Sequence, residues 1–138
     1  MKVLKETGFV LLVILCMAGC RPAGSVKVTV GEGTNMAAAL SPDNKTIAIS
    51  LQGGIWILPA AGGEAVRITD EFADAQEPSW SPDGERIAFH SYRDGNYHIW
   101  TIRKDGKQLM QHTFGFFDDR EPSWSPDGKS LVFSSDRS

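Results

Sequence analysis

One short phrase recurs along this chain and limits what it can fold into. The phrase Ser-Pro-Asp, followed by Gly or Asn, begins at Ser41, Ser81 and Ser125, so successive copies are 40 and 44 residues apart. A second phrase, Glu-Pro-Ser-Trp, ends at Trp80 and again at Trp124. This period is typical of one four-stranded blade of a β-propeller. Because a blade cannot bury both of its faces alone, the repeat predicts neighbouring blades of one ring.

The two intervals differ in length at one place only. Trp56 precedes Thr69 by 13 residues, and Trp100 precedes Thr113 by the same number. The four extra residues of the second interval therefore lie between the Ser-Pro-Asp phrase and the tryptophan. Loops vary in length while strands keep their register. The pattern indicates a repeat in which one hairpin loop has grown.

Each copy predicts four strands separated by turns. Proline presets φ in the Ser-Pro-Asp phrase, aspartate bonds nearby backbone, and glycine or asparagine accepts the positive φ that closes the turn. The strand segments are rich in Ile, Val, Phe and Trp and show no helical period. We expect strands at 46–50, 54–58 and 65–69 in the first copy, and at 78–80, 86–91, 97–103 and 108–113 in the second.

The predicted fold class is therefore all-β, an incomplete propeller of four-stranded antiparallel blades. Two blades and part of a third are expected, at about residues 35–75, 76–119 and 120–138. Helix is expected only in a short signal segment at the start of the chain.

The first 20 residues have the pattern of a signal peptide. Lys2 and Lys5 give a basic start, and residues 9–15 are an apolar run. That run is far shorter than the roughly 20 residues that a membrane-spanning helix needs. Residues 21–34, with three Gly and one Pro, are expected to be a tether.

The end of this segment, Met-Ala-Gly-Cys at 17–20, resembles a bacterial lipobox. The resemblance implies that Cys20 is lipidated and becomes the first residue of the mature chain. Arg21 follows in place of aspartate, which implies anchoring in the outer membrane on its periplasmic side. The alternative is an ordinary secretory signal with a chance cysteine.

Composition excludes several function classes. The net charge is −3 and no basic stripe occurs, so we expect no nucleic-acid partner. The chain's two cysteines, Cys16 and Cys20, both belong to the leader, so disulfide and thiol chemistry are not expected in the globular part.

No catalytic, metal or cofactor site is predicted. His90, His98 and His112 lie on different predicted strands, without short ligand spacing and without a cysteine partner. We interpret them as histidines near strand ends that bond neighbouring loops. A Gly-x-Ser-x-Gly nucleophile elbow does not occur either.

The candidate binding surface is a rim made of two kinds of loop. Loops 70–74 and 114–120 join successive blades, and in a propeller they lie on the same face as the hairpin between the second and third strands. Aromatic and charged residues gathered on one rim are typical of a partner surface. The alternative is that Phe116 and Phe117 pack between blades and the acids are solvated. The candidate residues are Tyr92, Arg93, Asp94, Asn96, Phe116, Phe117, Asp118, Asp119 and Arg120.

The repeated residues carry a family resemblance. Pro-Ser-Trp-Ser-Pro-Asp-Gly, then Ile-Ala-Phe, then Ile-Trp, resembles the WD-like repeat of TolB-type β-propellers over about residues 35–138. Segments 32–43 and 55–64 are similar to the N-terminal propeller of exported amidohydrolases. That resemblance implies a metal-dependent barrel following the propeller, with its catalytic residues beyond Ser138.

The predicted blades are too few to close a propeller. Propellers close with about four to eight blades, and the sequence stops at 134–138, inside a predicted hairpin, so we expect a fragment of a longer protein. The alternative is that several copies assemble into one ring.

Two function hypotheses follow. The first hypothesis is a non-catalytic binding or scaffold module of an exported lipoprotein, whose partner is an envelope protein. The second is the N-terminal propeller of a hydrolase, whose partner is the catalytic domain of the same parent chain.

Overall fold

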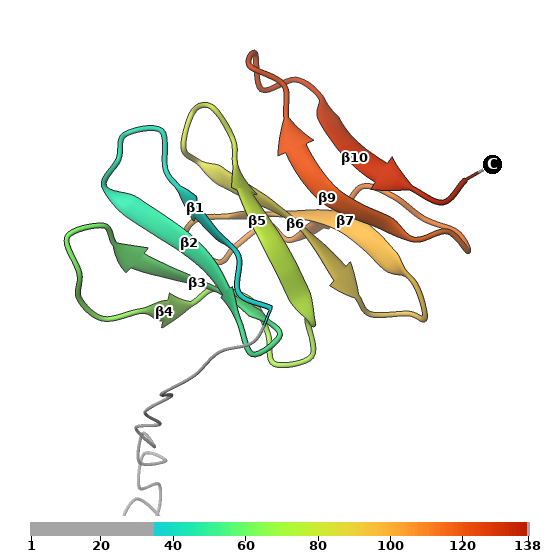
Figure 1. Cartoon of the computed structure of the whole chain (residues 1–138), viewed down its shortest axis with the longest axis horizontal. Helices are drawn as coiled ribbons and strands as arrows, with labels where there is room; N and C mark the ends of the chain where they lie inside the picture. The colour runs from blue at the N-terminus through green and yellow to red at the C-terminus, as the bar shows by residue number, and fades with distance from the viewer. Residues whose placement is uncertain (1–34, 138) are drawn as a thin grey trace, which may run out of the picture. The chain divides into compact units, whose positions relative to one another are not determined.

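The computed structural model describes residues 35–137, which form ten strands in three antiparallel sheets (Figure 1). The all-β class and the incomplete propeller predicted from the sequence are confirmed. The signal peptide, Cys20 and the tether lie outside the described residues. Within the described part, no helix is long and apolar enough to cross a membrane. The first sheet contains β1 (Ala38–Leu40), β2 (Thr46–Leu51), β3 (Gly54–Pro59) and β4 (Val66–Arg67); the second contains β5 (Ala75–Trp80), β6 (Arg86–Tyr92), β7 (Tyr97–Arg103) and β8 (Met110–Gln111); the third contains β9 (Asp119–Trp124) and β10 (Leu131–Ser135).

The Ser-Pro-Asp phrase forms the same turn in all three sheets. In the second sheet the Ser81 hydroxyl donates to the Asp83 carboxylate (2.6 Å) and accepts the N–H of Arg86 (2.9 Å). Gly84 has φ +69°, a conformation that a side chain would disfavour. Its counterpart Asn44 has φ 59°, in the left-handed region that asparagine adopts more readily than most other non-glycine residues. Each turn is therefore closed by its own side chains.

The first strand of a blade is longer than predicted and contains a bulge. We expected 78–80, whereas β5 begins at Ala75. Its pairing with β6 shifts register between Gln76 and Ser79, where Glu77 has φ 51° and Pro78 has no N–H to donate. Strand β9 repeats the bulge at Glu121, which has φ 57°. A bulge allows a proline within a strand, and this is why the sequence pattern placed the start of the strand too late.

The fourth strand of a blade is shorter than predicted. We expected 65–69 and 108–113, whereas β4 and β8 each have two residues. The Thr69 hydroxyl accepts the N–H of Ile55 at 3.0 Å, and the Thr113 hydroxyl accepts the N–H of Ile99 at 3.0 Å. A side-chain oxygen thus replaces a backbone carbonyl at this point, and the regular ladder ends before it.

The core lies between the first two blades. Ile55, Ile87 and Phe89 are fully buried in one cluster. The indole N–H of Trp80 donates to the carbonyl of Ala39 (3.0 Å), and that of Trp124 donates to Ser79 (3.2 Å). Each of these tryptophans therefore ties the first strand of its blade to the first strand of the blade before it. These two tryptophans stand at matching positions of the repeat, so the same contact between blades recurs with the repeat.

Candidate binding rim

The loops of the described part gather on two opposite sides. The rim, defined as residues 70–74, 92–96 and 114–120, lies at the lower and right-hand edges of Figure 1. The turn face, defined as residues 41–45, 60–65, 81–85, 104–109 and 125–129, includes the three Ser-Pro-Asp turns along the upper edge of that view. Alternating strand directions produce this division, because odd and even connections of an antiparallel sheet emerge at opposite ends.

An arginine joins the first part of the rim to the second blade. The Arg93 guanidinium lies 2.6 Å from the Asp70 carboxylate, in the loop that precedes β5. It also lies 4.9 Å from the centre of the Trp100 ring, in cation–π contact. The ion pair and the cation–π contact together hold Arg93 in place. The ion pair links two loops through residues that are 23 positions apart in the sequence.

An aspartate organises the second part of the rim. The Asp118 carboxylate accepts the backbone N–H of Tyr97 (3.0 Å) and the side-chain amide of Asn96 (3.4 Å), and it pairs with Arg120 at 2.8 Å. The N–H of Tyr97 and then the Arg120 guanidinium hold the pKa of Asp118 below its usual value. Asn96 also donates to the carbonyl of Phe116 (3.3 Å). The loop before β9 is thus attached to the β6–β7 hairpin of the preceding blade.

Two cation–π contacts complete this attachment. The Arg120 guanidinium lies 3.9 Å from the Tyr97 ring centre. Arg137, which follows β10, pairs with Asp119 at 2.6 Å and lies 5.3 Å from the ring of Phe117. Asp119 itself is fully buried, so it holds the rim together from inside and does not face outward.

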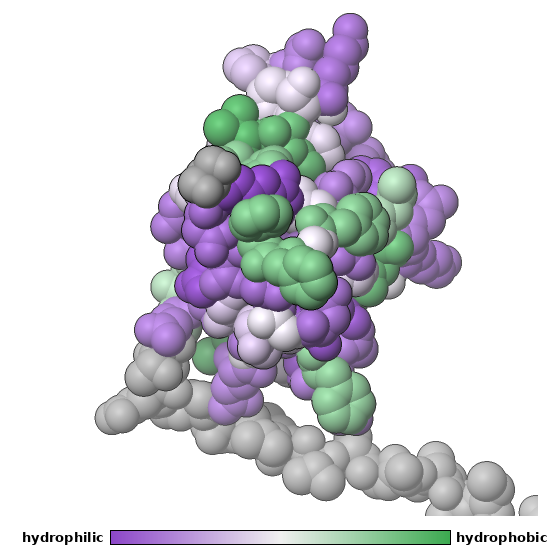
Figure 2. All heavy atoms as spheres, turned by 90° about the vertical axis from the view of Figure 1, so that its right-hand side faces the viewer, coloured by the Kyte–Doolittle hydropathy of each residue, from purple (hydrophilic) through white to green (hydrophobic). Residues whose placement is uncertain are grey.

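Exposed aromatic rings remain on this side of the molecule. Phe116 is 92% exposed and so does not pack between the blades formed by residues 35–137, and Phe117 is 41% exposed. Phe72 in the neighbouring inter-blade loop is 79% exposed. Figure 2 looks at the side that carries β9, β10 and the loop before them, and shows apolar side chains interspersed with hydrophilic ones. The rim therefore presents separate rings within a polar surface.

The remaining predicted rim residues lie on the β6–β7 hairpin. Tyr92 is exposed, with its ring centre 5.1 Å from that of Tyr97. The Asp94 carboxylate is largely exposed and lies 3.4 Å from the ring of buried His98. The structure thus brings all nine predicted rim residues to one side, with Asp119 beneath the surface; their role in binding stays a prediction.

The three histidines contact neighbouring strands and the β6–β7 hairpin. His90 is buried beside the third sheet, and its Nδ1 accepts the N–H of Glu121 at 3.2 Å. Burial, and then the nearby Arg120 guanidinium, lower the pKa of His90 to about 4. His112 bonds the hydroxyl of Thr101 at 2.8 Å.

The sequence did not reveal several residues that hold the rim. Asp70 and Trp100 fix Arg93, and Tyr97 carries the guanidinium of Arg120. One signal was available: Arg93 and Arg137 are 44 residues apart, at matching positions of two repeats. Their partners, Asp70 and Asp119, do not stand at matching positions, so spacing alone could not give them.

The arrangement suits binding. Its cations are already paired, its rings are exposed, and among residues 35–137 no group of three His, Cys, Asp or Glu side chains could hold a metal ion. Fixed charges beside exposed rings are what a recognition surface needs, since little further ordering is required when a partner arrives.

Known proteins show the same fold and sequence pattern. A solved structure titled putative TolB from Agrobacterium tumefaciens superposes with a TM-score of 0.70 and 28% identity, over 80% of this chain and 42% of that one. The uncharacterized peptidase YuxL of Bacillus subtilis (strain 168) is 40% identical over 72 residues, covering 49% of this chain and 11% of the relative. Tricorn protease homolog 1 of Streptomyces coelicolor (strain ATCC BAA-471 / A3(2) / M145) is 33% identical over 54 residues, covering 39% of this chain and 5% of the relative.

The chain thus spans about a tenth or less of the curated relatives and under half of the solved structure. The relatives are described as peptidases, so the resemblance to exported amidohydrolases stays a prediction. The model of the TolB beta propeller domain matches residues 22–138, most of the chain, and the chain therefore belongs to the TolB β-propeller domain family.

Proposed function

We propose that this chain is a non-catalytic binding module of an exported lipoprotein, and that its rim binds a protein partner. The single observation that carries the proposal is the exposure of Phe116, at 92%, beside arginines fixed by ion pairs. Binding sites are commonly placed on loops that a rigid scaffold positions. In this chain the blades are the scaffold and the inter-blade contacts fix the loops.

The lipobox-like end of the leader supports the location part of the proposal. Export, and anchoring through Cys20 on the periplasmic side of the outer membrane, would place the rim among envelope proteins. Labelling cells with a radioactive fatty acid tests the anchor: the full chain should incorporate the label and its Cys20→Ser variant should not. Equal labelling of both would contradict a lipid on Cys20.

A second candidate is favoured by the relatives, which are named as a peptidase and a protease. In this candidate the chain is the propeller of a longer hydrolase, and the rim contacts the catalytic domain or limits access to it. The missing blades of the ring would then come from the same parent chain; assembly of several copies is the alternative. An amidohydrolase parent stays a prediction within this candidate.

A photo-crosslinking residue at position 116 of the full chain, expressed in its source cells, tests the proposal. The control places the same residue at position 66, on β4, where Val66 is 60% exposed. We expect an adduct with another envelope protein from position 116 only. A link to a catalytic domain of one parent chain favours the second candidate. Equal adducts from both positions, or none from 116, would contradict the role of the rim.

A further inference from the structure

We infer that the rim recognises an extended polypeptide segment that presents basic side chains alternating with aromatic or aliphatic ones along one of its faces. The inference rests on the proposed function, since it assumes that the rim is the binding surface. It adds the chemistry of the partner, and three features of the described residues carry it.

The first feature is the charge of the rim. It contains six acidic residues and two basic ones, whereas the turn face contains six acidic residues and four lysines. Both rim arginines are already bound to carboxylates, Arg93 to Asp70 and Arg120 to Asp118. Glu71 and Asp74 are exposed and have no ion pair within residues 35–137. The charge left for a partner is therefore negative, which attracts cations and repels nucleic acid.

The second feature is the apolar part of the same surface. Phe72 and Phe116, from two successive inter-blade loops, are 79% and 92% exposed, and Phe114 is 65% exposed. Exposing aromatic rings of this size to water is unfavourable in free energy, because their apolar area stays hydrated. Such exposure is typical of a surface that binds a partner. The carboxylates lie beside them in the same loops, as with Glu71 and Phe72.

The third feature is the way apolar and acidic side chains alternate. The side shown in Figure 2 has apolar groups interspersed with hydrophilic ones, with no continuous apolar sheet. A membrane surface or the face of an amphipathic helix would need a continuous apolar area. In an extended segment every second side chain points to the same side, so a face on which basic and apolar side chains alternate suits a surface of separated rings and charges.

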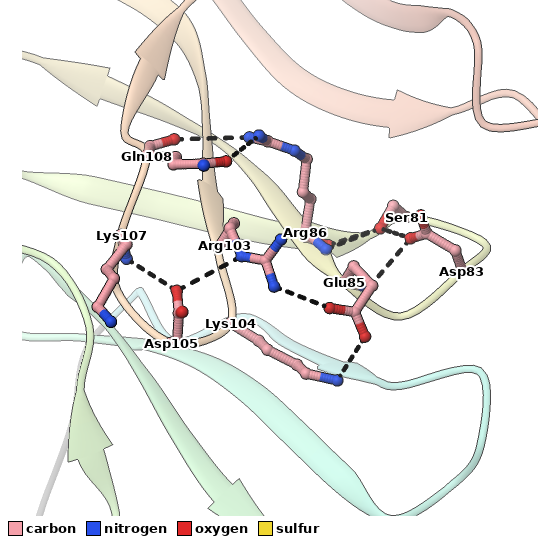
Figure 3. A network of polar contacts seen from close by, with 9 residues as sticks. All are labelled: Ser81, Asp83, Glu85, Arg86, Arg103, Lys104, Asp105, Lys107 and Gln108. Atoms are coloured by element: carbon pink, nitrogen blue, oxygen red, sulfur yellow. Dashed lines mark hydrogen bonds and ion pairs between the residues drawn. The ribbon is translucent and has the colours of Figure 1, made fainter.

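The turn face carries no aromatic side chain. Five of its six carboxylates serve the fold; for example, Asp83 closes its turn with Ser81, and Glu85 pairs with Arg103 at 3.2 Å and Lys104 at 2.7 Å (Figure 3). None of the large hydrophobic residues above 60% exposure lies on it. This makes it a matched negative control within the same chain.

The test uses the purified full chain and a labelled peptide in which lysine and phenylalanine alternate at every second position, with serine between them, and binding is followed by fluorescence anisotropy. One comparison peptide has glutamate for lysine, and the other has serine for phenylalanine. We expect the first peptide to bind at least about tenfold more tightly than either comparison peptide, and raised salt to weaken it.

Two pairs of matched variants locate the site. Glu71→Gln should weaken binding about two- to fivefold, and Phe116→Ser about fivefold or more. Glu64→Gln and Val66→Ser, which change exposed residues away from the rim, should leave binding unchanged. All four replace exposed side chains, and circular dichroism of each variant checks that the fold persists.

The outcomes separate this inference from the proposed function. If the glutamate peptide binds equally well or better and Phe116→Ser weakens it, the rim binds but the partner chemistry is wrong. If the lysine peptide fails to bind, or the control variants weaken it as much as the rim variants, the inference is overturned. If position 116 also yields no crosslink in cells, the proposed function falls with it.

Discussion

The rim and the turn face are built by the same repeat but use it differently. On the turn face the three Ser-Pro-Asp turns keep the same residues and the same bonds: serine donates to aspartate at 2.6 Å in every copy. On the rim side the partners change: the matching residues Arg93 and Arg137 pair with Asp70 and Asp119, which do not stand at matching positions. Repetition on one side indicates a constraint from folding. Variation on the other leaves side chains available for recognition.

The largest expected effect breaks the contact between blades. Trp80→Ala removes a buried indole and its bond to Ala39, so we expect the free energy of unfolding of the full chain to fall by about 3 to 5 kcal/mol. Urea denaturation followed by circular dichroism measures it. The control is Phe116→Ala on the rim, with an expected change below about 0.5 kcal/mol. Similar losses in both variants would remove the distinction between a structural side and a binding side.

The next effect concerns a single turn. Ser81→Ala removes the acceptor of the Arg86 N–H and the donor to Asp83, and we expect a loss of about 1 to 3 kcal/mol because Ser81 is buried. The same substitution removes the hydrogen bond that is the main cause of the lowered pKa of Asp83, so that pKa should rise. Denaturation and carboxyl titration by NMR provide the two measurements. An unchanged stability would show that the turn closes without its serine.

The third prediction concerns pH. The pKa of His90 is about 4 in the folded chain and about 6.5 in an unfolded one, so the unfolded state binds the proton first as pH falls. Its contribution is complete above about pH 6.5 and is lost on the way down to pH 4. We expect that loss to be about 1 to 2 kcal/mol, after allowing for partial solvation.

Stability curves at several pH values measure this effect. In His90→Gln the loss between pH 6.5 and 4 should be smaller, and the lowered pKa values of Asp43 and Asp83 then affect stability at lower pH. A wild-type curve that is flat across the window would contradict a neutral, buried His90.

The smallest effect concerns an ion pair of the rim. Asp70→Asn breaks the contact with Arg93, and because both groups are partly exposed we expect a loss of less than about 1 kcal/mol. A double-mutant cycle with Arg93→Gln isolates the pair. A coupling energy well above this range would mean that the rim contributes to stability as the turn face does.

Sequence reasoning recovered the features that repeat. The period of the Ser-Pro-Asp phrase predicted the blades, and Trp80 and Trp124, which recur with it, connect the first strands of neighbouring blades. It misplaced the ends of the first and fourth strands, because a bulge at Glu77 and a hydroxyl at Thr69 alter the ladder without changing the hydrophobic pattern.

For the candidate rim, the sequence predicted which loops share a side but not which side chains meet. Asp70 and Arg93 are 23 residues apart, and Asn96 and Asp118 are 22 apart, in loops whose lengths differ between blades. Such pairs depend on how two blades pack. Burial of Asp119 could not be foreseen either, since its neighbours Asp118 and Arg120 are more exposed.

Hydrogen exchange of the full chain, with and without the lysine–phenylalanine peptide, tests most directly whether the rim is the binding side. We predict slower exchange of backbone amides in residues 92–96 and 114–120 on binding, and no change in residues 81–85. Protection of the turn face, with the rim unchanged, would contradict the division of roles between the two sides.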